Sequence, residues 1–332
     1  MPANQGTDLT QTTPKRKPAG YRTPRNAPSR TGATESRVSA PKPKRPGFES
    51  VAGMDELKET LRRDVIDALR QRDRYREYGL TIPNGILFYG PPGCGKSFMA
   101  ERFAGEVGCR VIAVTGSDVA SIFVDGSVEK IRALFDRAKK LSPCVLSFDE
   151  FDAVVPNRGA DLHQGYRTEV NEFLTQLQGI SKFNVIFLAT TNSPELIDPA
   201  ILRSGRIDRL VYVSPPDERA REDMFRIHLE SRPKEDGIDL THLATLTEHF
   251  VASDIKLIVD DAARVALRDH TRISERNLTA VILSRRPSIS PALLSKYKQI
   301  QDDWAEHGSG GEPRHTQNVV GFQRPRRLTA RG

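Results

Sequence analysis

The chain has 332 residues, of which 37% are hydrophobic and 28% are charged, and its formal net charge is +7. This length is enough for one large or two modest hydrophobic cores. Three cysteines without a CxxC spacing argue against structural zinc and a disulfide framework, and no apolar run suits a membrane span or a signal peptide, so we expect a cytoplasmic protein.

The two ends of the chain differ in composition from its middle. Residues 1–47 contain eight prolines and ten Lys or Arg but only Asp8 and Glu35 as acids, which is typical of a disordered basic tail. Residues 306–332 are also basic and poor in apolar side chains, and we predict a second disordered tail there. Because acids slightly outnumber bases between the tails, the high isoelectric point belongs to the tails. The tails are interpreted either as solvated arms or as arms that attract nucleic acid or an anionic surface.

Apolar residues at helical spacing predict an amphipathic helix before the first strand. These residues are Met54, Leu57, Leu61, Val65 and Leu69. Beyond this helix, short apolar runs predict strands at residues 85–89, 110–114, 144–148, 184–190 and 209–213. Helical patterns separate the strands, at residues 96–107, 128–140 and 168–178. This alternation implies crossover connections and predicts an α/β fold with a doubly wound, five-stranded parallel sheet.

After Pro215 the strand pattern ends and only helical patterns remain. They cover residues 219–230, 240–249, 253–268, 275–283 and 291–304. We therefore predict two folded domains, a large α/β domain over residues 48–215 and a small all-α domain over residues 216–305.

The segment from Gly90 to Ser97 reads GPPGCGKS and directly follows the first predicted strand. Glycines in such a loop adopt positive φ angles and carry no Cβ, so successive backbone NH groups can surround a phosphate. Lys96 would reach the β and γ phosphates, and the hydroxyl of Ser97 would bind Mg²⁺. The pattern predicts that the chain binds a nucleoside triphosphate.

The third predicted strand ends in two acids, Asp149 and Glu150. Ligands of doubly wound sheets bind at the carboxyl ends of the strands, where these acids lie. Asp149 would hold Mg²⁺ and Glu150 would polarise the attacking water as a general base. The alternative is a strand that ends in a solvated acidic turn, and the phosphate loop favours the catalytic interpretation.

Five motifs in one order make this chain resemble the AAA family of ATPases. They are FESVAGMDELK, GPPGCGKS, LSFDEFDAV, ATTN and DPAILRSGRID. The resemblance covers residues 48–304, and RPSISPALLSKYKQI is similar to the final helix of single-ring members. It implies ATP and Mg²⁺ as cofactors, a helical lid over residues 216–305, a homo-oligomeric ring of six subunits, and a protein substrate reached directly or through an adaptor.

The resemblance also assigns residues that complete an ATPase site. Asn192, at the end of ATTN, matches the first sensor, which contacts the γ phosphate or the attacking water; the alternative is an Asn that caps a turn. Arg203 and Arg206 match arginine fingers that reach the nucleotide of a neighbouring subunit; the alternative is two surface arginines.

The nucleotide-contacting residues implied by the motifs and the resemblance lie in four segments. They are Ala52 and Gly53, then Pro92, Gly93, Cys94, Gly95, Lys96, Ser97 and Phe98, then Asp149, and finally His228, Ala252 and Ser253. His228 is interpreted either as a lid contact or as an ordinary helix residue. Ala252 stands where the family usually has Gly, a departure that puts nucleotide affinity in doubt.

Cys94 lies between NH donors, Lys96 and a helix N-terminus, an environment that lowers thiol pKa values. One hypothesis is therefore an oxidisable thiolate, and the alternative is a small residue that fills space.

Phe123, in the apolar tip IFV, matches the pore-loop aromatic with which the family grips a polypeptide, although the family's usual Gly is Asp125 here. The alternative is simple packing at a helix end.

We predict a ring-forming, Mg²⁺-dependent ATPase that remodels, unfolds or disassembles proteins. A nucleotide-switched factor that acts on nucleic acid or an anionic surface through the basic tails is the second hypothesis. A nucleotide-binding scaffold without turnover is disfavoured.

Overall fold

The computed structural model describes residues 46–80, 82–115, 118, 128–154, 164–202, 205–307 and 319–320, and the statements below concern these residues. Most of the two predicted tails, Phe123, Asp125 and Arg203 lie outside the described residues.

The first described elements are helical and precede the sheet. They are η1 (Phe48–Ser50), α1 (Asp55–Leu61), the π-helical turn η2 (Arg62–Ile66), α2 (Asp67–Arg70) and α3 (Arg72–Glu77). The strands are β1 (Gly85–Tyr89), β2 (Arg110–Val114), β3 (Cys144–Phe148), β4 (Val185–Thr191), β5 (Arg209–Tyr212) and β6 (Val319–Val320). The helices between strands are α4 (Lys96–Val107), α6 (Val128–Lys140) and α7 (Gln164–Ile180). Short η turns at Phe151–Ala153, Ser181–Phe183, Pro194–Leu196 and Pro199–Leu202 complete this part.

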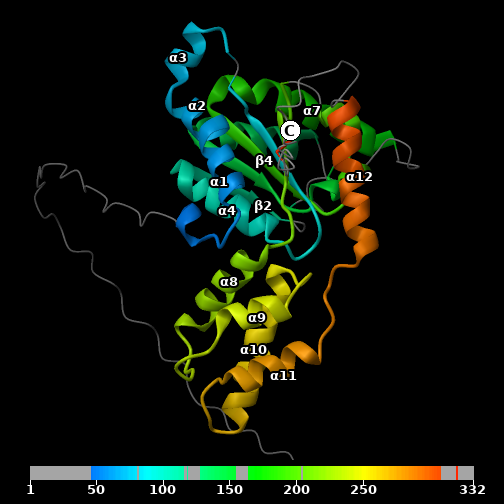
Figure 1. Cartoon of the computed structure of the whole chain (residues 1–332). Helices are drawn as coiled ribbons and strands as arrows, with labels where there is room; N and C mark the ends of the chain where they lie inside the picture. The colour runs from blue at the N-terminus through cyan, green and yellow to red at the C-terminus, as the bar shows by residue number, and fades with distance from the viewer. Residues whose placement is uncertain are drawn as a thin grey trace, which may run out of the picture. The chain divides into compact units, whose positions relative to one another are not determined.

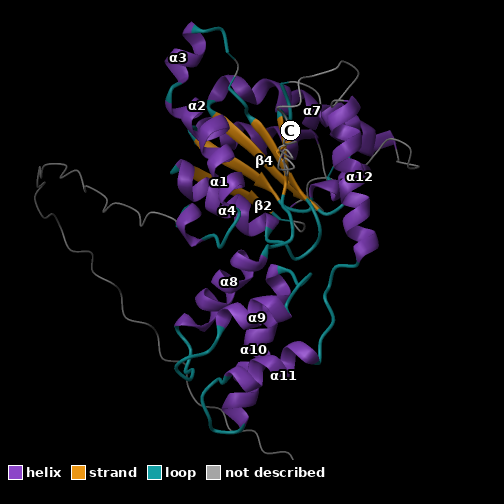
Figure 2. Cartoon of the chain, in the orientation of Figure 1, coloured by secondary structure: helices purple, strands orange, loops and turns teal. Residues whose placement is uncertain are grey.

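The strands form one parallel sheet in the order β2-β3-β4-β1-β5-β6 (Figure 2). The five predicted strands and their parallel arrangement are confirmed. β6 is an addition, because Val319 and Val320 pair with Leu210 and Val211 at the free edge of β5. These two residues lie within residues 306–332, for which the sequence predicts a disordered tail.

Both faces of the sheet are covered at its centre, which explains why β1, β3 and β4 are mostly apolar and buried along nearly their whole length. Along β1, Leu87 and Tyr89 belong to the cluster that includes α6 and α7, whereas Ile86 and Phe88 belong to the cluster that includes α1 and α4. Figure 1 shows α1 and α4 on one side of the strands and α7 on the other. Successive side chains of a strand point to opposite faces, so β1 contributes to both cores.

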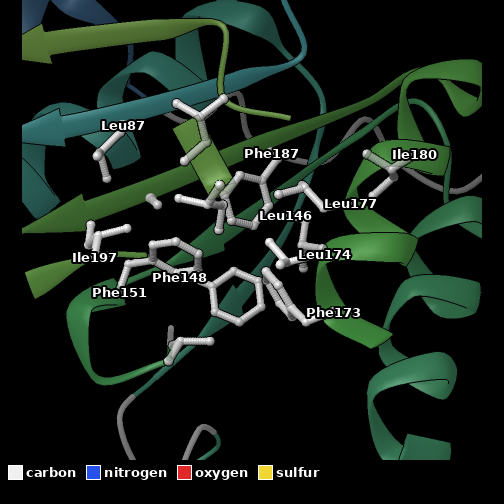
Figure 3. Packing of buried hydrophobic residues seen from close by; sticks show 14 of the residues in the cluster. Leu87, Leu146, Phe148, Phe151, Phe173, Leu174, Leu177, Ile180, Phe187 and Ile197 are labelled. Carbon is white, nitrogen blue, oxygen red and sulfur yellow. The ribbon is translucent and has the colours of Figure 1, made fainter. Parts of the chain in front are cut away.

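Four phenylalanine rings form the centre of one core (Figure 3). Phe173 on α7 lies with its ring centroid 5.4 Å from that of Phe148, 5.8 Å from Phe151 and 6.0 Å from Phe187. The Phe148 and Phe173 ring planes are 89° apart, the edge-to-face geometry that aromatic pairs favour. Because Phe148 is the last residue of β3, this cluster fixes the strand end that carries Asp149.

Phe173→Ala is expected to lower the free energy of unfolding by about 3–5 kcal/mol, since it removes a ring that is 1% exposed and leaves a cavity among four other rings, those of Phe135, Phe148, Phe151 and Phe187. Urea unfolding followed by fluorescence or circular dichroism measures the change. Phe183→Ala is the matched control, because that ring is 46% exposed, and we expect it to cost less than about 1 kcal/mol. Equal losses in the two variants would contradict the assignment of Phe173 to the core.

A second set of helices follows β5 and has its own core. They are α8 (Glu218–Glu230), α9 (Leu240–Leu246), α10 (Ala252–Arg268) and α11 (Glu275–Leu283). Asp217 caps α8 through its side chain, which accepts from the Ala220 amide at 2.7 Å. The four helices share one apolar cluster that includes Phe225, Ile258 and Leu278. We refer to α8–α11 as the helical domain.

The last helix, α12 (Pro291–His307), does not join the cluster of the helical domain. Tyr297 is 2% exposed and belongs to the core of the sheet, and the Trp304 ring lies 4.9 Å from that of Tyr89. The predicted helical domain over residues 216–305 therefore does not pack as a single unit. The amphipathic pattern of α12 identified an apolar face but not the core that this face joins.

Within the described ranges, no helix is long and apolar enough to cross a membrane.

Candidate functional site

The loop between β1 and α4 has the backbone shape of a phosphate loop. Gly93 and Gly95 adopt φ angles of +78° and +90°, in the left-handed region that side chains disfavour. A Cβ on Gly93 would also lie 2.4 Å from the Ser253 hydroxyl oxygen. Helix α4 begins at Lys96, so the free NH groups of its first turn face the loop.

Lys96 is buried at the base of this loop, with 7% of its surface exposed. Its Nζ donates hydrogen bonds to the carbonyl oxygens of Gly90 at 2.9 Å and Pro91 at 2.8 Å. Burial lowers the pKa of Lys96, and the nearby Cys94, Asp149 and Asp152 partly oppose this effect. Both acceptors are neutral carbonyls, so the buried ammonium has no direct carboxylate partner in the described part of the chain. Such a site fits an anionic ligand.

Asp149 lies beside the start of α4 and the end of β4. The Ser97 hydroxyl donates to its Oδ1 at 2.8 Å, and the Thr190 hydroxyl donates to the same oxygen. No group of three or more His, Cys, Asp or Glu side chains suited to a metal is found among the described residues. Mg²⁺ in nucleotide sites typically uses one or two protein ligands together with phosphates and waters, and the Ser97–Asp149 pair fits that requirement.

Glu150 follows Asp149 in a backbone conformation that is unusual for a residue with a side chain. Its φ and ψ angles are 53° and 51°, in the left-handed region. This conformation costs about 1–2 kcal/mol, and such strain is concentrated at functional sites. Glu150 is exposed and lines the same cavity as Asp149. Its position and exposure are suited to a group that contacts water.

Asn192 follows β4 at the same edge of the sheet. The Thr191 hydroxyl donates to Asp152 Oδ1 at 2.6 Å and accepts from the Ser193 amide at 2.9 Å. These bonds fix the backbone on both sides of Asn192. The Asn192 side chain takes no part in these hydrogen bonds, and Asn192 lines the cavity.

The phosphate loop, the strand ends and the helical domain together enclose a cavity of about 460 Å³, within the usual range for small-molecule sites. Fourteen predicted site residues line it. They are Ala52, Pro92, Gly93, Cys94, Gly95, Lys96, Ser97, Phe98, Asp149, Glu150, Asn192, His228, Ala252 and Ser253. The Ser253 amide donates to the Gly93 carbonyl at 3.2 Å, which joins the helical domain directly to the phosphate loop.

Among the predicted site residues that the structure describes, two lie outside the cavity lining. Gly53 contacts the helical domain instead, since a Cβ there would lie 2.4 Å from the Ala220 Cβ. Arg206 donates from Nη1 to the Ala200 carbonyl at 2.7 Å. Arg206 therefore does not line the cavity of its own chain.

The thiolate hypothesis for Cys94 is wrong. The residue is 1% exposed, and burial raises the pKa of its thiol to about 12 despite the opposing effect of Lys96. Its side chain packs in the core with Val251 and Ile289. Desolvation therefore outweighs the positive environment, and Cys94 acts as a small apolar residue.

Burial lowers the pKa of His228, with Arg232 adding to the effect, so the ring is neutral at pH 7.

Sequence reasoning missed several residues that line the cavity. They are Met54, Thr190, Thr191, Met224, Ile227 and Lys256. The two threonines directly precede Asn192, so their place in the sequence could have identified them. No sequence pattern marked Met54 before α1, the two apolar residues on α8 or the lysine on α10 as cavity residues.

Comparison with known proteins agrees with this geometry. The model of the ATPase family associated with various cellular activities (AAA) matches residues 86–215, and the model of the AAA+ lid domain matches residues 237–279. The chain belongs to the AAA family. The AAA match contains the phosphate loop, Asp149, Glu150 and Asn192, and the lid match lies within the helical domain.

Several relatives share this AAA region. The ATP-dependent zinc metalloprotease FtsH 3 of Symbiobacterium thermophilum is 39% identical over 241 residues, 71% of this chain and 38% of that protein. The ATP-dependent zinc metalloprotease FtsH of Caldicellulosiruptor bescii is 40% identical over 229 residues, 68% of this chain and 37% of that protein. The cell division cycle protein 48 homolog of Archaeoglobus fulgidus is 32% identical over 276 residues, 77% of this chain and 38% of that protein. The chain thus spans less than half the length of these AAA relatives.

Proposed function

We propose that this chain is a Mg²⁺-dependent ATPase that forms a ring and uses ATP hydrolysis to remodel, unfold or disassemble proteins. The observation that carries the proposal is the convergence of the buried Lys96, the Ser97–Asp149 pair, Glu150 and Asn192 on one cavity. Membership of the AAA family supports it.

Each group then has a distinct role. Lys96 and the NH groups of the loop bind the phosphates, and Ser97 and Asp149 hold Mg²⁺, which when bound neutralises charge on the phosphates. Glu150 accepts a proton from the attacking water, and Asn192 orients that water or the γ phosphate. Ala52 and His228 contact the base or ribose, with Ala252 and Ser253 closing the same side.

The remaining charge stabilisation comes from a second subunit. Arg203 and Arg206 of one subunit reach the γ phosphate held by its neighbour, which requires a closed ring, for which we propose six subunits. Within its own chain, the Arg206 guanidinium donates from Nη1 to the Ala200 carbonyl and from Nη2 to Gln178 Oε1, which lies on α7.

The substrate is proposed to be a protein gripped by Phe123, directly or through an adaptor. Support comes from the relatives, two of which are named ATP-dependent metalloproteases, enzymes that act on protein. We also propose that the protein is cytoplasmic and that the chain divides into a large domain at residues 48–215 and a lid.

The experiment that tests the function measures phosphate release from ATP with and without an unfolded protein such as casein. We expect Mg²⁺-dependent turnover that the unfolded protein stimulates at least about twofold, and Phe123→Ala to abolish the stimulation without abolishing basal turnover. Phe183→Ala, which removes an exposed phenylalanine elsewhere, is the control. Stimulation by DNA instead, lost on deletion of residues 1–47, would favour the nucleic-acid hypothesis. No turnover under any condition would overturn the ATPase proposal.

A further inference from the structure

Helix α12 contacts the loop that carries Asn192, although the contacting residues lie 101 and 105 positions apart in the sequence. Tyr297 Oη donates a hydrogen bond to the backbone carbonyl oxygen of Asn192. One position earlier, Lys296 Nζ lies 2.5 Å from Glu195 Oε1. Adjacent residues of α12 thus hold both ends of the short segment from Asn192 to Glu195.

The Tyr297 side chain has little freedom to move away. The residue is 2% exposed, belongs to the core of the sheet, and its ring centroid lies 6.2 Å from that of Tyr212 on β5. Burial raises the pKa of Tyr297, so the hydroxyl keeps its proton and remains a donor at physiological pH. A buried donor with a fixed ring imposes a position on the carbonyl that it binds.

On its other side, the Asn192 segment is tied to the acids of the site. Thr190 donates to Asp149 and Thr191 donates to Asp152, while the Ser193 amide donates back to Thr191. The backbone of Asn192 is consequently held between the end of β4 and α12. Loss of the hydrogen bond from Tyr297 would free the Asn192 carbonyl. The hydrogen bonds of Thr191 and Ser193 on the β4 side would remain.

We propose that Tyr297 is a positioning residue that sets the orientation of the Asn192 carboxamide in the cavity through its hydrogen bond to the Asn192 carbonyl. The inference rests on the proposed ATPase function. Tyr297 itself does not line the cavity, so its effect on turnover passes through Asn192.

Tyr297→Phe tests this role because it removes the hydroxyl and keeps the ring in the core. We expect kcat to fall about tenfold, the consequence of losing one hydrogen bond that aligns a reacting group, while KM and the dissociation constant for ATP change less than about twofold. Tyr212→Phe is the matched control, since it removes a hydroxyl from the neighbouring ring, and we expect it to leave kcat unchanged. An unchanged kcat in Tyr297→Phe would overturn the inference.

A double-mutant cycle shows whether the effect passes through Asn192. In an Asn192→Ala background, Tyr297→Phe is expected to change kcat less than about twofold, because the group that it positions is gone. A tenfold loss that persists in this background would identify a general structural effect and overturn the positioning role.

Hydrogen–deuterium exchange of the nucleotide-free protein gives a readout that does not depend on turnover. We expect faster exchange in the peptide covering residues 190–196 for Tyr297→Phe and no change for Tyr212→Phe. Equal exchange in the two variants would contradict the bond. Wild-type turnover separates the two proposals: if the wild type hydrolyses ATP and Tyr297→Phe behaves like it, only the positioning role fails, and if the wild type does not hydrolyse ATP, the function and the role fail together.

Discussion

Glu150→Gln is expected to lower kcat by at least about a hundredfold while ATP remains bound, since general base catalysis contributes about 10²–10⁴ in rate. The amide has nearly the same shape as the carboxylate but cannot accept a proton from water at neutral pH. Binding should persist because Lys96 and the Ser97–Asp149 pair are intact. Phosphate release measures turnover, and titration with a fluorescent ATP analogue measures affinity.

The matched control is Glu230→Gln, because Glu230 is an exposed acid at the end of α8 that does not line the cavity. It should leave kcat within about twofold. Turnover in Glu150→Gln equal to that of the wild type would remove Glu150 from the role of base. A parallel loss of ATP binding would instead assign it a binding role.

Arg206→Ala is expected to lower kcat about a thousandfold, the lower end of the contribution of an arginine finger to phosphoryl transfer. The guanidinium stabilises negative charge that develops on the γ phosphate, and alanine leaves that charge uncompensated. Because Arg206 also bonds the Ala200 carbonyl, a thermal unfolding midpoint must accompany the activity. Arg137→Ala, at an exposed position of α6, is the control and should retain activity.

Mixed assemblies decide whether Arg206 acts on a neighbour. A subunit with Arg206→Ala keeps its own Glu150, and a subunit with Glu150→Gln keeps its own Arg206, so some interfaces between them contain one intact site. Mixing these two inactive variants should restore part of the activity if the arginine acts between subunits. Activity that stays at the level of the separate variants would place Arg206 in a role within its own chain.

The large domain could be predicted from the sequence because its signals are local. The central strands β1, β3 and β4 are mostly apolar runs that both faces of the sheet bury, and the structure has all five predicted strands within one residue of the predicted ends. GPPGCGKS predicted the loop for the same reason, since its glycines specify a backbone shape over a few residues.

The features that could not be predicted depend on contacts between distant segments. The environment of Cys94 in sequence is cationic, but its depth in the core depends on Val251 and Ile289, which are more than 150 residues away. The same holds for Tyr297 and Asn192: nothing in the pattern of α12 indicates which carbonyl its hydroxyl binds. The helical period predicted the element, and tertiary packing determined its partner.

The return of α12 to the sheet also constrains how the helical domain can move. The chain enters this domain after β5 and leaves it through residues 284–290, and both flanking elements are packed on the large domain. The helical domain is therefore connected to the large domain at both of its ends, and the hydrogen bond from the Ser253 amide to the Gly93 carbonyl is a further contact between them. A displacement of α8–α11 away from the phosphate loop would have to break that bond while both connections stay attached.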